Sequence, residues 1–370
     1  KNTKKKLMHI TIDTQELKHI LETTARVSAK HVTLPVLQCV LLEASKTTLT
    51  VKATNLEIGI EGTVKSKTTN EGSVAVPAQT LLQTVNLVTQ KETTLILESD
   101  VLTVKTKTSQ TEIKSISHDD FPSIPRITDN KKQINGEIFA LGIKTAAFAA
   151  SQSSIKPELG SIYIFQKKEH TLTFVATDSF RLIEKAVPMQ GVTLDGPLLI
   201  PYKNALELAR VAEEKEDEVT LSINENQCSI EAGSIYITSR LTNGTFPDYE
   251  QIIPKEYVTH ATTLTNDLSQ ALKKTNIFLN KFMQLTIIVG EGSMTFSSQS
   301  NDVGTTTETI NASVDGDEIT LNFNQRYVQE VLSYIVDDSV TLHFAGIGRP
   351  VVLESVHDKT LRYLVMPMNK

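Results

Sequence analysis

The sequence predicts an α+β protein built from three copies of one domain, and a repeated strand pattern is the main evidence. Three near-identical strand cores recur at offsets of 123 and 122 residues, at Thr48–Val51, Thr171–Phe174 and Ser293–Phe296. An apolar strand that ends in proline before a helical pattern also occurs twice, at Val74–Pro77 and Leu198–Pro201. This period exceeds the roughly 20–50 residues of solenoid repeats. We therefore expect three whole domains, and such pseudo-symmetry suggests a ring or an array.

In the first repeat, apolar residues at helical spacing predict a helix that starts at Thr14. Apolar and alternating runs predict strands over 36–42, 48–53 and 58–64. Pro77 is well placed just before a second helix, because the first turn of a helix has no donor to lose. Three more strands are expected over 94–97, 101–106 and 111–116.

The other two repeats show the same order of elements. We expect helices near 141–153, 202–214, 265–281 and 324–336, with strands such as 218–223 and 228–232 between them. Turn residues cluster in linkers at 121–125 and 246–254. The expected organisation is an N-terminal extension over 1–7 followed by domains at 8–127, 128–254 and 255–370, each with two helices and two antiparallel sheets.

Composition favours a soluble globular protein, with 39% hydrophobic and 22% charged residues in a chain of 370. Cys39 and Cys228 fall in strand-like runs of different repeats, so we expect two buried thiols in a reducing compartment. No run reaches the ~18–20 apolar residues of a membrane span. No apolar signal core follows the basic segment 1–7, so a non-folded extension and a cytoplasmic location are expected.

Charge is unevenly distributed along the chain, whose net charge is −6. The six predicted helical segments together carry +5, which leaves −11 for the rest. If the helices share a surface, that surface is basic. Ordinary solvated helix faces are the other interpretation, and charge alone favours it. The basic candidates are Lys18, Arg26, Lys30, Lys144, Lys156, Lys203, Arg210, Lys273, Lys274 and Lys281.

No pattern of catalytic or metal-binding residues stands out. The sequence has no Gly-rich phosphate loop, no Ser-centred elbow and no His-x-x-x-His pair, and its eight histidines are scattered. Asp178 and Arg181 are better explained as an ion pair or turn at the end of a strand than as catalytic groups. We therefore expect no enzymatic activity, no metal and no cofactor.

Six short motifs occur in a fixed order along the chain. They are Thr33-Leu34-Pro35-Val36-Leu37, Ala53-Thr54-Asn55-Leu56-Glu57, Asp120-Phe121-Pro122, the segment Val175 to Leu182, Gly244-Thr245-Phe246-Pro247-Asp248-Tyr249 and Leu364-Val365-Met366-Pro367-Met368. Each is weak alone, but their order on a threefold repeat is specific. Together they resemble the β sliding clamp family, the processivity subunit of bacterial DNA polymerase III, and the resemblance runs from about Met8 to Lys370.

The resemblance implies a head-to-tail homodimer that forms a ring of six domains around double-stranded DNA. Twelve helices would line the channel, so the basic candidates would face DNA, and a β shell would lie outside. Since a closed ring holds DNA topologically, weak contacts to phosphates suffice, and these permit sliding. At the dimer contact, Ile113 of one subunit would face the region of Ile277 and Phe278 of the other.

The family also binds linear peptide motifs of polymerase, clamp loader and repair proteins in an apolar pocket between the second and third domains. Methionine is soft and suits a surface that accepts many related peptides. Without the resemblance, Met366–Met368 would be taken as a terminal strand that packs on its own domain. The implied pocket residues are Leu159, Thr177, Ser179, Arg181, Leu182, Pro247, Ile252, Val365, Met366, Pro367 and Met368.

Two other classes of protein remain as alternatives. A threonine-rich β-repeat adhesion or structural protein would explain the tandem domains, but not two amphipathic helices in each repeat. A hydrolase is disfavoured because no nucleophile and base form a coherent set. Mass in solution, together with retention on circular but not linear DNA, distinguishes the three.

Overall fold

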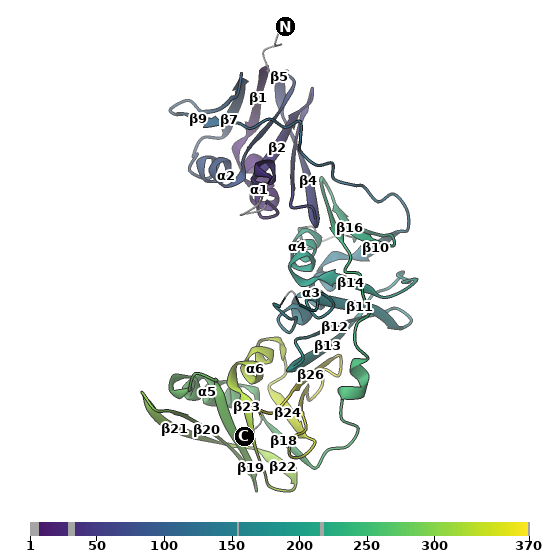
Figure 1. The fold of residues 1–370 in the computed structure, drawn as a ribbon, viewed down its shortest axis with the longest axis vertical. Helices are drawn as coiled ribbons and strands as arrows, with labels where there is room; N and C mark the ends of the chain where they lie inside the picture. Colours follow the sequence, from purple (N-terminus) through teal and green to yellow (C-terminus); the bar gives the residue numbers. More distant parts are fainter. Residues whose placement is uncertain (1–6, 29–33, 154, 215–217, 369–370) are drawn as a thin grey trace. The chain divides into compact units, whose positions relative to one another are not determined.

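The computed structural model describes residues 7–28, 34–153, 155–214 and 218–368. Internal contacts divide the chain into two compact units, one formed by 1–140 with 203–241 and the other by 141–202 with 242–370 (Figure 1). Each unit therefore combines a terminal third of the chain with part of the middle third. The boundary falls inside one helix, α3 (Gly136–Ala147).

The described residues of the first unit form two antiparallel sheets. One has five strands in the order β5-β1-β7-β8-β9, and the other has eight in the order β10-β15-β16-β17-β4-β3-β2-β6. The elements are β1 (Leu7–Asp13), α1 (Thr14–Ala25), a 3₁₀ turn (Pro35–Gln38), β2 (Cys39–Ala44), β3 (Thr48–Thr54), β4 (Ile58–Lys65), β5 (Lys67–Asn70), β6 (Gly72–Pro77), α2 (Ala78–Asn86), β7 (Glu92–Glu98), β8 (Val101–Lys105), β9 (Gln110–Lys114), β10 (Lys131–Asn135), α4 (Tyr202–Ala212), β15 (Glu218–Ile223), β16 (Gln227–Ala232) and β17 (Ile235–Arg240).

In the second unit, too, the part of the chain that the structure describes forms two antiparallel sheets. Nine strands run in the order β14-β11-β12-β13-β26-β25-β24-β18-β22, and four in the order β21-β20-β19-β23. The elements are β11 (Ser161–Lys168), β12 (Thr171–Thr177), β13 (Arg181–Pro188), β14 (Leu198–Pro201), a 3₁₀ turn (Tyr249–Ile252), β18 (Thr259–Leu264), α5 (Thr265–Thr275), a 3₁₀ turn (Asn276–Phe278), β19 (Gln284–Gly290), β20 (Ser293–Ser300), β21 (Gly304–Asn311), β22 (Ser313–Gly316), β23 (Ile319–Asn324), α6 (Gln325–Glu330), a 3₁₀ turn (Val331–Tyr334), β24 (Ser339–Phe344), β25 (Val351–Ser355) and β26 (Leu361–Val365).

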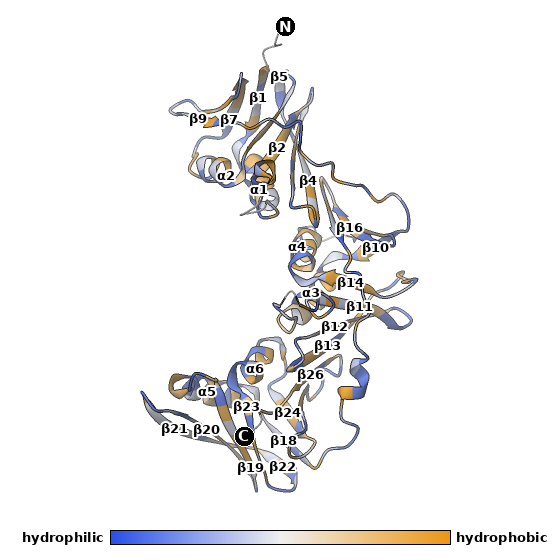
Figure 2. Ribbon diagram, viewed as in Figure 1, coloured by the Kyte–Doolittle hydropathy of each residue, from blue (hydrophilic) through white to orange (hydrophobic). Residues whose placement is uncertain are grey.

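Helices pack against the sheets in both units. In the first unit α1 packs against α2 and β4, and in the second α5 packs against β20 and β21. Hydrophobic and hydrophilic residues alternate along many strands (Figure 2), as in β1, where every second side chain is buried. This period-two burial places one face of each such strand in a core.

The most informative feature of the fold is a strand junction that occurs once in each unit. In the first unit β4 pairs with β17, and in the second β13 pairs with β26. Both junctions join strands that are far apart in the sequence, and they share one register. Directly paired residues run Leu221–Ile230–Ile237–Ile60–Ala53 across the first junction and Leu342–Leu353–Tyr363–Ile183–Ala176 across the second.

The predicted helix starts at Thr14 and after Pro77 are confirmed, but the third helix was placed wrongly. It spans 136–147 rather than 141–153, because Asn135 accepts a hydrogen bond of 2.9 Å from the Ile138 N–H and caps an earlier start. The expected helices at 265–281 and 324–336 are shorter too, since α5 and α6 each give way to a 3₁₀ turn.

The structure also bears on the expectations about the two cysteines, the N-terminal residues and membrane-spanning segments. Cys39 and Cys228 are free and buried, as predicted, and burial raises the pKa of Cys39 to about 11. Leu7, expected in the N-terminal extension, belongs to β1 and lies opposite Glu98; residues 1–6 lie outside the described part. No helix in the described part of the chain is long and apolar enough to cross a membrane.

Candidate functional site

The turn between β12 and β13 is held by side-chain hydrogen bonds. Thr177 Oγ1 donates to the Arg181 carbonyl oxygen (2.6 Å) and accepts from the Ser179 N–H (3.1 Å). Asp178 Oδ1 accepts from the N–H groups of Phe180 (3.0 Å) and Arg181 (3.1 Å). Ser179 adopts a left-handed φ of 77°, and the Phe180 side chain is 60% exposed. The turn therefore uses Thr177 and Asp178 internally and presents Ser179 and Phe180 outward.

Arg181 is a buried cation whose guanidinium binds groups of the protein itself. Its Nε donates to Asp178 Oδ2 (3.0 Å), its Nη2 to the Phe148 carbonyl (2.7 Å) and its Nη1 to Glu330. The guanidinium carbon also lies 4.5 Å from the centre of the Tyr327 ring. The ion pair expected between Asp178 and Arg181 is thus confirmed. The side chain supports the turn from within, so a partner would not meet it at the surface.

Electrostatics fix the charges of this cluster. Burial alone would lower the pKa of Arg181, but Tyr363, Glu330 and Asp178 outweigh burial and raise it. Burial alone would raise the pKa of Glu330, but hydrogen bonds from Arg326 and Arg181 hold it below its usual value. Both groups therefore stay ionised at neutral pH, and together they brace β13 against α6.

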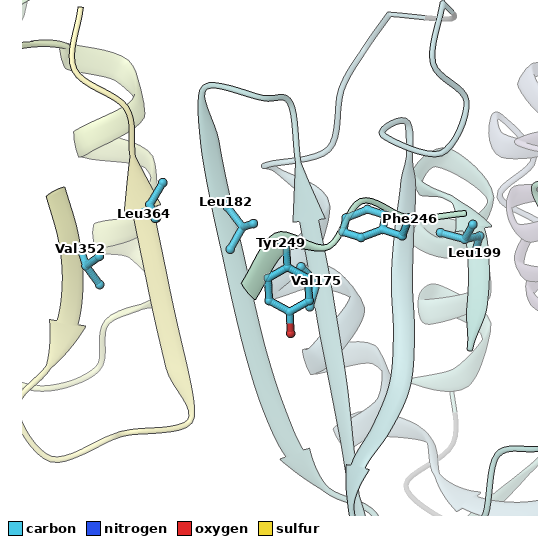
Figure 3. Close-up of a cluster of buried hydrophobic side chains, with 7 residues drawn as sticks. All are labelled: Val175, Leu182, Leu199, Phe246, Tyr249, Val352 and Leu364. Carbon is cyan, nitrogen blue, oxygen red and sulfur yellow. The ribbon is translucent and has the colours of Figure 1, made fainter. Parts of the chain in front are cut away.

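Beside this turn lies an apolar cluster that spans β12, β13, β14, β25, β26 and the segment before β18. Figure 3 shows Leu182 and Leu364 on neighbouring strands, with Tyr249 and Phe246 following from the segment that carries the Phe-Pro motif. Tyr163 stacks on Phe246 at a centroid distance of 4.8 Å. The buried members of the cluster are Val175, Leu182, Leu199, Phe246, Tyr249, Val352 and Leu364, and Tyr163, Phe165, Ile253, Tyr257 and Met366 pack against them.

The structure divides the implied peptide-pocket residues into a buried group and an accessible group. All of them belong to the second unit. Leu159, Thr177, Arg181, Leu182 and Val365 are buried, so they can only form the floor or its support. Met366, Pro367 and Met368 are half-buried, while Ser179, Pro247 and Ile252 are exposed. These six residues are the ones a partner could contact.

The aromatic residues of the cluster were not selected from the sequence. Phe246 and Tyr249 lie in the motif Gly244–Tyr249, but the resemblance does not assign them to the pocket. Tyr163 and Phe165 stand two residues apart on β11, and this period-two spacing puts both on one face. This spacing predicts that the two aromatic side chains share a face of the strand, but it does not identify the segments that pack against that face.

The basic candidates are less concentrated on helices than the sequence suggested. With the observed helix bounds, the six helices carry only +1, because Arg26, Lys156 and Lys281 lie outside them. Lys30 lies outside the described residues. The expectation that the helices carry +5 is therefore corrected. Arg26 caps the C-terminal end of α1, where a cation interacts favourably with the helix dipole. Lys156 and Lys281 lie in the segments that follow α3 and α5.

Several of these cations already have partners. Arg26 lies 3.5 Å from Glu207, which also pairs with Arg210. Lys274 pairs with Glu308 at 2.8 Å. Lys18 donates to the Val88 carbonyl at 2.8 Å, and Lys281 lies over the Phe282 ring. Lys144, Lys203, Lys273 and Arg210 lie on helices α3, α4 and α5.

The residues expected at a dimer contact lie near two sheet edges. Ile113 is on β9, and its side chain is 5% exposed. Ile277 is 65% exposed, and Phe278 is half-buried next to Gly304 at the start of β21. Among the described strands, β9 pairs only with β8 and β21 only with β20. Each strand thus leaves one side free for hydrogen bonding.

The described residues contain no group of three or more His, Cys, Asp and Glu side chains that could hold a metal ion. His260 and His343, both in the described part of the chain, lie close together, with their Nδ1 atoms 2.7 Å apart.

Comparison with known proteins gives consistent matches along the whole chain. Residues 8–125 match the N-terminal domain of the DNA polymerase III beta subunit, residues 133–248 its central domain and residues 250–369 its C-terminal domain. The beta sliding clamp of Staphylococcus epidermidis is 24% identical over 376 residues, covering 98% of this chain and 99% of the relative. The beta sliding clamp of Staphylococcus aureus is 24% identical over 378 residues with the same coverage.

Solved structures agree in fold. The DnaN sliding clamp of Pseudomonas aeruginosa, bound to griselimycin, superposes with a TM-score of 0.90 at 25% identity, covering 98% of this chain and 100% of that one. The DNA polymerase III beta subunit of Thermotoga maritima superposes with a TM-score of 0.92 at 23% identity, with the same coverage. Because its identity to this chain is 23%, the Thermotoga maritima structure shows the fold of the chain alone.

Proposed function

Because this chain belongs to the DNA polymerase III beta subunit family, we propose that it is a sliding clamp, a processivity factor without enzymatic activity of its own. Two copies form a head-to-tail ring that encircles double-stranded DNA without sequence preference. The ring tethers polymerase, clamp loader and repair proteins through linear peptide motifs, and it works in the cytoplasm. Three domains at 8–127, 128–254 and 255–370 make up each subunit. Nothing in the comparisons favours an adhesion protein.

The repeated strand junction is the observation that carries this proposal. The chain makes the same pairing twice, and two matching edges remain open. In the first unit, directly paired residues run Leu95–Val104–Thr111 and end at the edge strand β9. In the second unit, they run Ser298–Thr306 and end at the edge strand β21. By the register of the two internal junctions, Thr111 of one subunit would lie opposite Thr306 of the other. An open edge is a template for pairing with another chain.

This register brings the expected contact residues together. If Thr111 lies opposite Thr306, then Ile113 lies opposite Gly304, whose neighbour within the subunit is Phe278. Each subunit offers both edges, so two such contacts close a twofold ring of six similar domains. A head-to-tail contact that closes in this way gives a ring instead of a filament.

The contacts between such a ring and DNA are expected to be weak. The chain has a net charge of −6, and several of the basic candidates already pair with carboxylates of the same chain. Lys203, Lys273 and the other basic candidates would meet phosphates without base readout. Because topology holds the DNA, the protein needs no tight contact, and weak phosphate contacts leave it free to slide.

The turn at 177–181 and its apolar cluster would receive the partner peptides. Leu182, Leu364 and Val365 form a rigid floor. Ile252, Met366 and Met368 lie at the accessible edge, where two or three apolar side chains of a peptide could be buried. Thr177 and Arg181 hold the turn at 177–181 in place by their internal hydrogen bonds, and Leu159 is buried in the same unit.

Mass in solution together with DNA retention tests the proposal. A sliding clamp should sediment as a dimer and, once loaded, stay on circular DNA but run off a linear fragment. A monomeric chain, or one retained equally by both DNA forms, would contradict it.

A further inference from the structure

The turn between β3 and β4 repeats the turn between β12 and β13 contact by contact. Thr54 Oγ1 donates to the Ile58 carbonyl (2.9 Å) and accepts from the Leu56 N–H (3.1 Å). Asn55 Oδ1 accepts from the N–H groups of Glu57 and Ile58, both at 3.0 Å. Leu56 has a φ of 78°, against 77° for Ser179 at the equivalent position. The first unit thus carries a second copy of the turn that borders the proposed peptide pocket.

Leu56 is a costly residue at this position. A left-handed backbone conformation is unfavourable for a non-glycine residue, and 46% of the Leu56 surface is exposed. Its side chain therefore recovers little of that cost by burial. The other copy of the turn shows that a serine fits the same geometry. A strained, exposed leucine at this point is explained if it contacts a ligand.

A cavity of about 210 Å³ lies against this turn. Leu56, Ile58 and Pro122 are among its lining residues, and Pro122 follows Phe121 as Pro247 follows Phe246 at the other turn. The cavity is smaller than the ~300–1,000 Å³ of pockets that enclose whole small molecules. Its size suits one anchoring side chain of a larger partner.

The wall of this cavity is fixed by close packing of the linker. A Cβ atom at Gly59 would lie 2.9 Å from Ile124 Cγ2, so the linker rests directly on the backbone of β4. Pro122 and Pro125 in the same linker limit its backbone freedom. A preformed cavity of this kind binds a side chain without a cost for ordering the protein.

The rim of the cavity carries one charge of each sign. Glu57 Oε1 and Arg240 Nη1 lie 4.0 Å apart, and their side chains are 61% and 59% exposed. An exposed pair this far apart contributes little to stability. Each partner can therefore exchange its ion pair for one with a ligand. A peptide with an apolar anchor between a basic and an acidic residue is complementary to this rim.

We propose that the cavity at Leu56, Pro122 and Arg240 is a second binding site for linear peptides. Its occupant is a short extended segment of a partner protein, with a leucine-like anchor in the cavity and flanking residues of opposite charge at Glu57 and Arg240. The inference rests on the proposed function, because the chemistry of the site is argued from its likeness to the proposed peptide pocket. Each subunit would then hold two such segments at once.

Photo-crosslinking of the full chain tests the site directly. The probe is the peptide acetyl-Lys-Leu-Ser-Leu-Asp-amide with photo-leucine at its first leucine, and mass spectrometry maps the attachment points. We expect one group of crosslinks within 54–59 and 122–125, and another around Met366. A peptide with serine at the second leucine should label both groups less.

Two matched substitutions separate the sites. Leu56→Asp should lower labelling of 54–59 and 122–125 about tenfold or more, since the apolar wall is lost, and should leave labelling around Met366 unchanged. Aspartate tolerates the left-handed conformation better than leucine, so this variant should fold. Ser179→Asp, at the equivalent position of the other turn, should lower labelling around Met366 and leave labelling of 54–59 and 122–125 unchanged.

The possible failures are distinguishable. Absence of crosslinks within 54–59 and 122–125, or their full retention in Leu56→Asp, would overturn the second site. Crosslinks there with none around Met366 would support the second site and contradict the peptide pocket of the proposed function.

Discussion

The main-chain N–H of Met366 donates a hydrogen bond of 2.8 Å to the carbonyl oxygen of Phe180. This bond extends the pairing of β13 with β26 one residue beyond Arg181 and Val365. It fixes the half-buried Met366 beside the exposed Phe180, at the edge of the apolar cluster. The terminal segment therefore belongs to the wall of the proposed pocket by backbone bonding, and a side chain can be changed there without removing the bond.

Met366→Asp should abolish binding of a polymerase-derived peptide. The new carboxylate would lie against the apolar anchors of the peptide, whose burial contributes on the order of 1.5–3 kcal/mol each. Isothermal titration calorimetry measures the loss against the micromolar affinity expected for the wild type. Val336→Asp changes a residue that is 91% exposed outside this pocket, and it should bind normally. Undiminished affinity in Met366→Asp would place the pocket elsewhere.

Replacing Ile277 and Phe278 with aspartate should convert the dimer to a monomer. Both charges would be buried at the contact with β9 of the other subunit without partners, which is costly. Analytical ultracentrifugation gives the mass. Ile155→Asp, at a residue that is 87% exposed, serves as the control and should remain dimeric. A dimer that survives the double substitution would exclude this edge from the contact.

Lys273→Ala should flatten the salt dependence of DNA binding more than Lys274→Ala. Each lost phosphate contact lowers the slope of log affinity against log salt by roughly one unit. Lys274 already pairs with Glu308 at 2.8 Å, so it releases fewer counterions from DNA. Fluorescence anisotropy of duplex DNA over a salt series measures both slopes. Equal, unchanged slopes would mean that α5 does not face DNA.

Arg181→Met should destabilise the protein by about 3–5 kcal/mol, because Glu330 and Asp178 would be left without their buried cation. Urea denaturation followed by circular dichroism measures the shift. Arg326 also binds Glu330, but its side chain is 61% exposed, so Arg326→Met should cost less than about 1 kcal/mol. Equal effects of the two substitutions would show that Arg181 does not brace β13 as described.

Acidification should weaken the protein through His343. Burial lowers the pKa of this imidazole, and the charges of His260, Lys359 and Arg362 lower it further against the opposing effect of Glu354. The unfolded chain therefore takes up the proton first, so stability present above about pH 6.5 is lost as pH falls below that value. Urea midpoints at pH 7.5 and 5.5 should differ less in His343→Gln. If the urea midpoints of the wild type and of His343→Gln change equally with pH, His343 is not the group responsible for the loss of stability.

The repeats, most strands and the starts of several helices could be predicted from the sequence because they depend on local patterns. Apolar periodicity predicts a strand over 48–53, which is observed as β3 (Thr48–Thr54), and Pro77 marks a helix start. The start of α3 could not be placed, because it depends on the cap formed when the Ile138 N–H donates to Asn135 Oδ1, a contact that apolar periodicity does not show.

Much of the site depends on contacts between distant segments, which local patterns do not show. The pairing of Arg181 with Glu330 joins residues 149 positions apart, and the junctions of β4 with β17 and of β13 with β26 join strands from different repeats. The sequence identifies Arg181 as a site residue by resemblance, but its burial and internal bonding follow only from the fold.

Topological linkage to DNA tests the central claim most directly. Thr111→Cys and Thr306→Cys in one chain should place two thiols opposite each other at both subunit contacts, within the ~3.5–4.5 Å between Cβ atoms that a disulfide needs. Oxidation in the presence of a nicked plasmid should then give a protein ring that stays with the circle in sodium dodecyl sulfate and is released when the plasmid is cut. Thr111→Cys with Thr309→Cys, three residues out of register, should not close. Crosslinked protein that dissociates from the intact circle in detergent would contradict a clamp that encircles DNA.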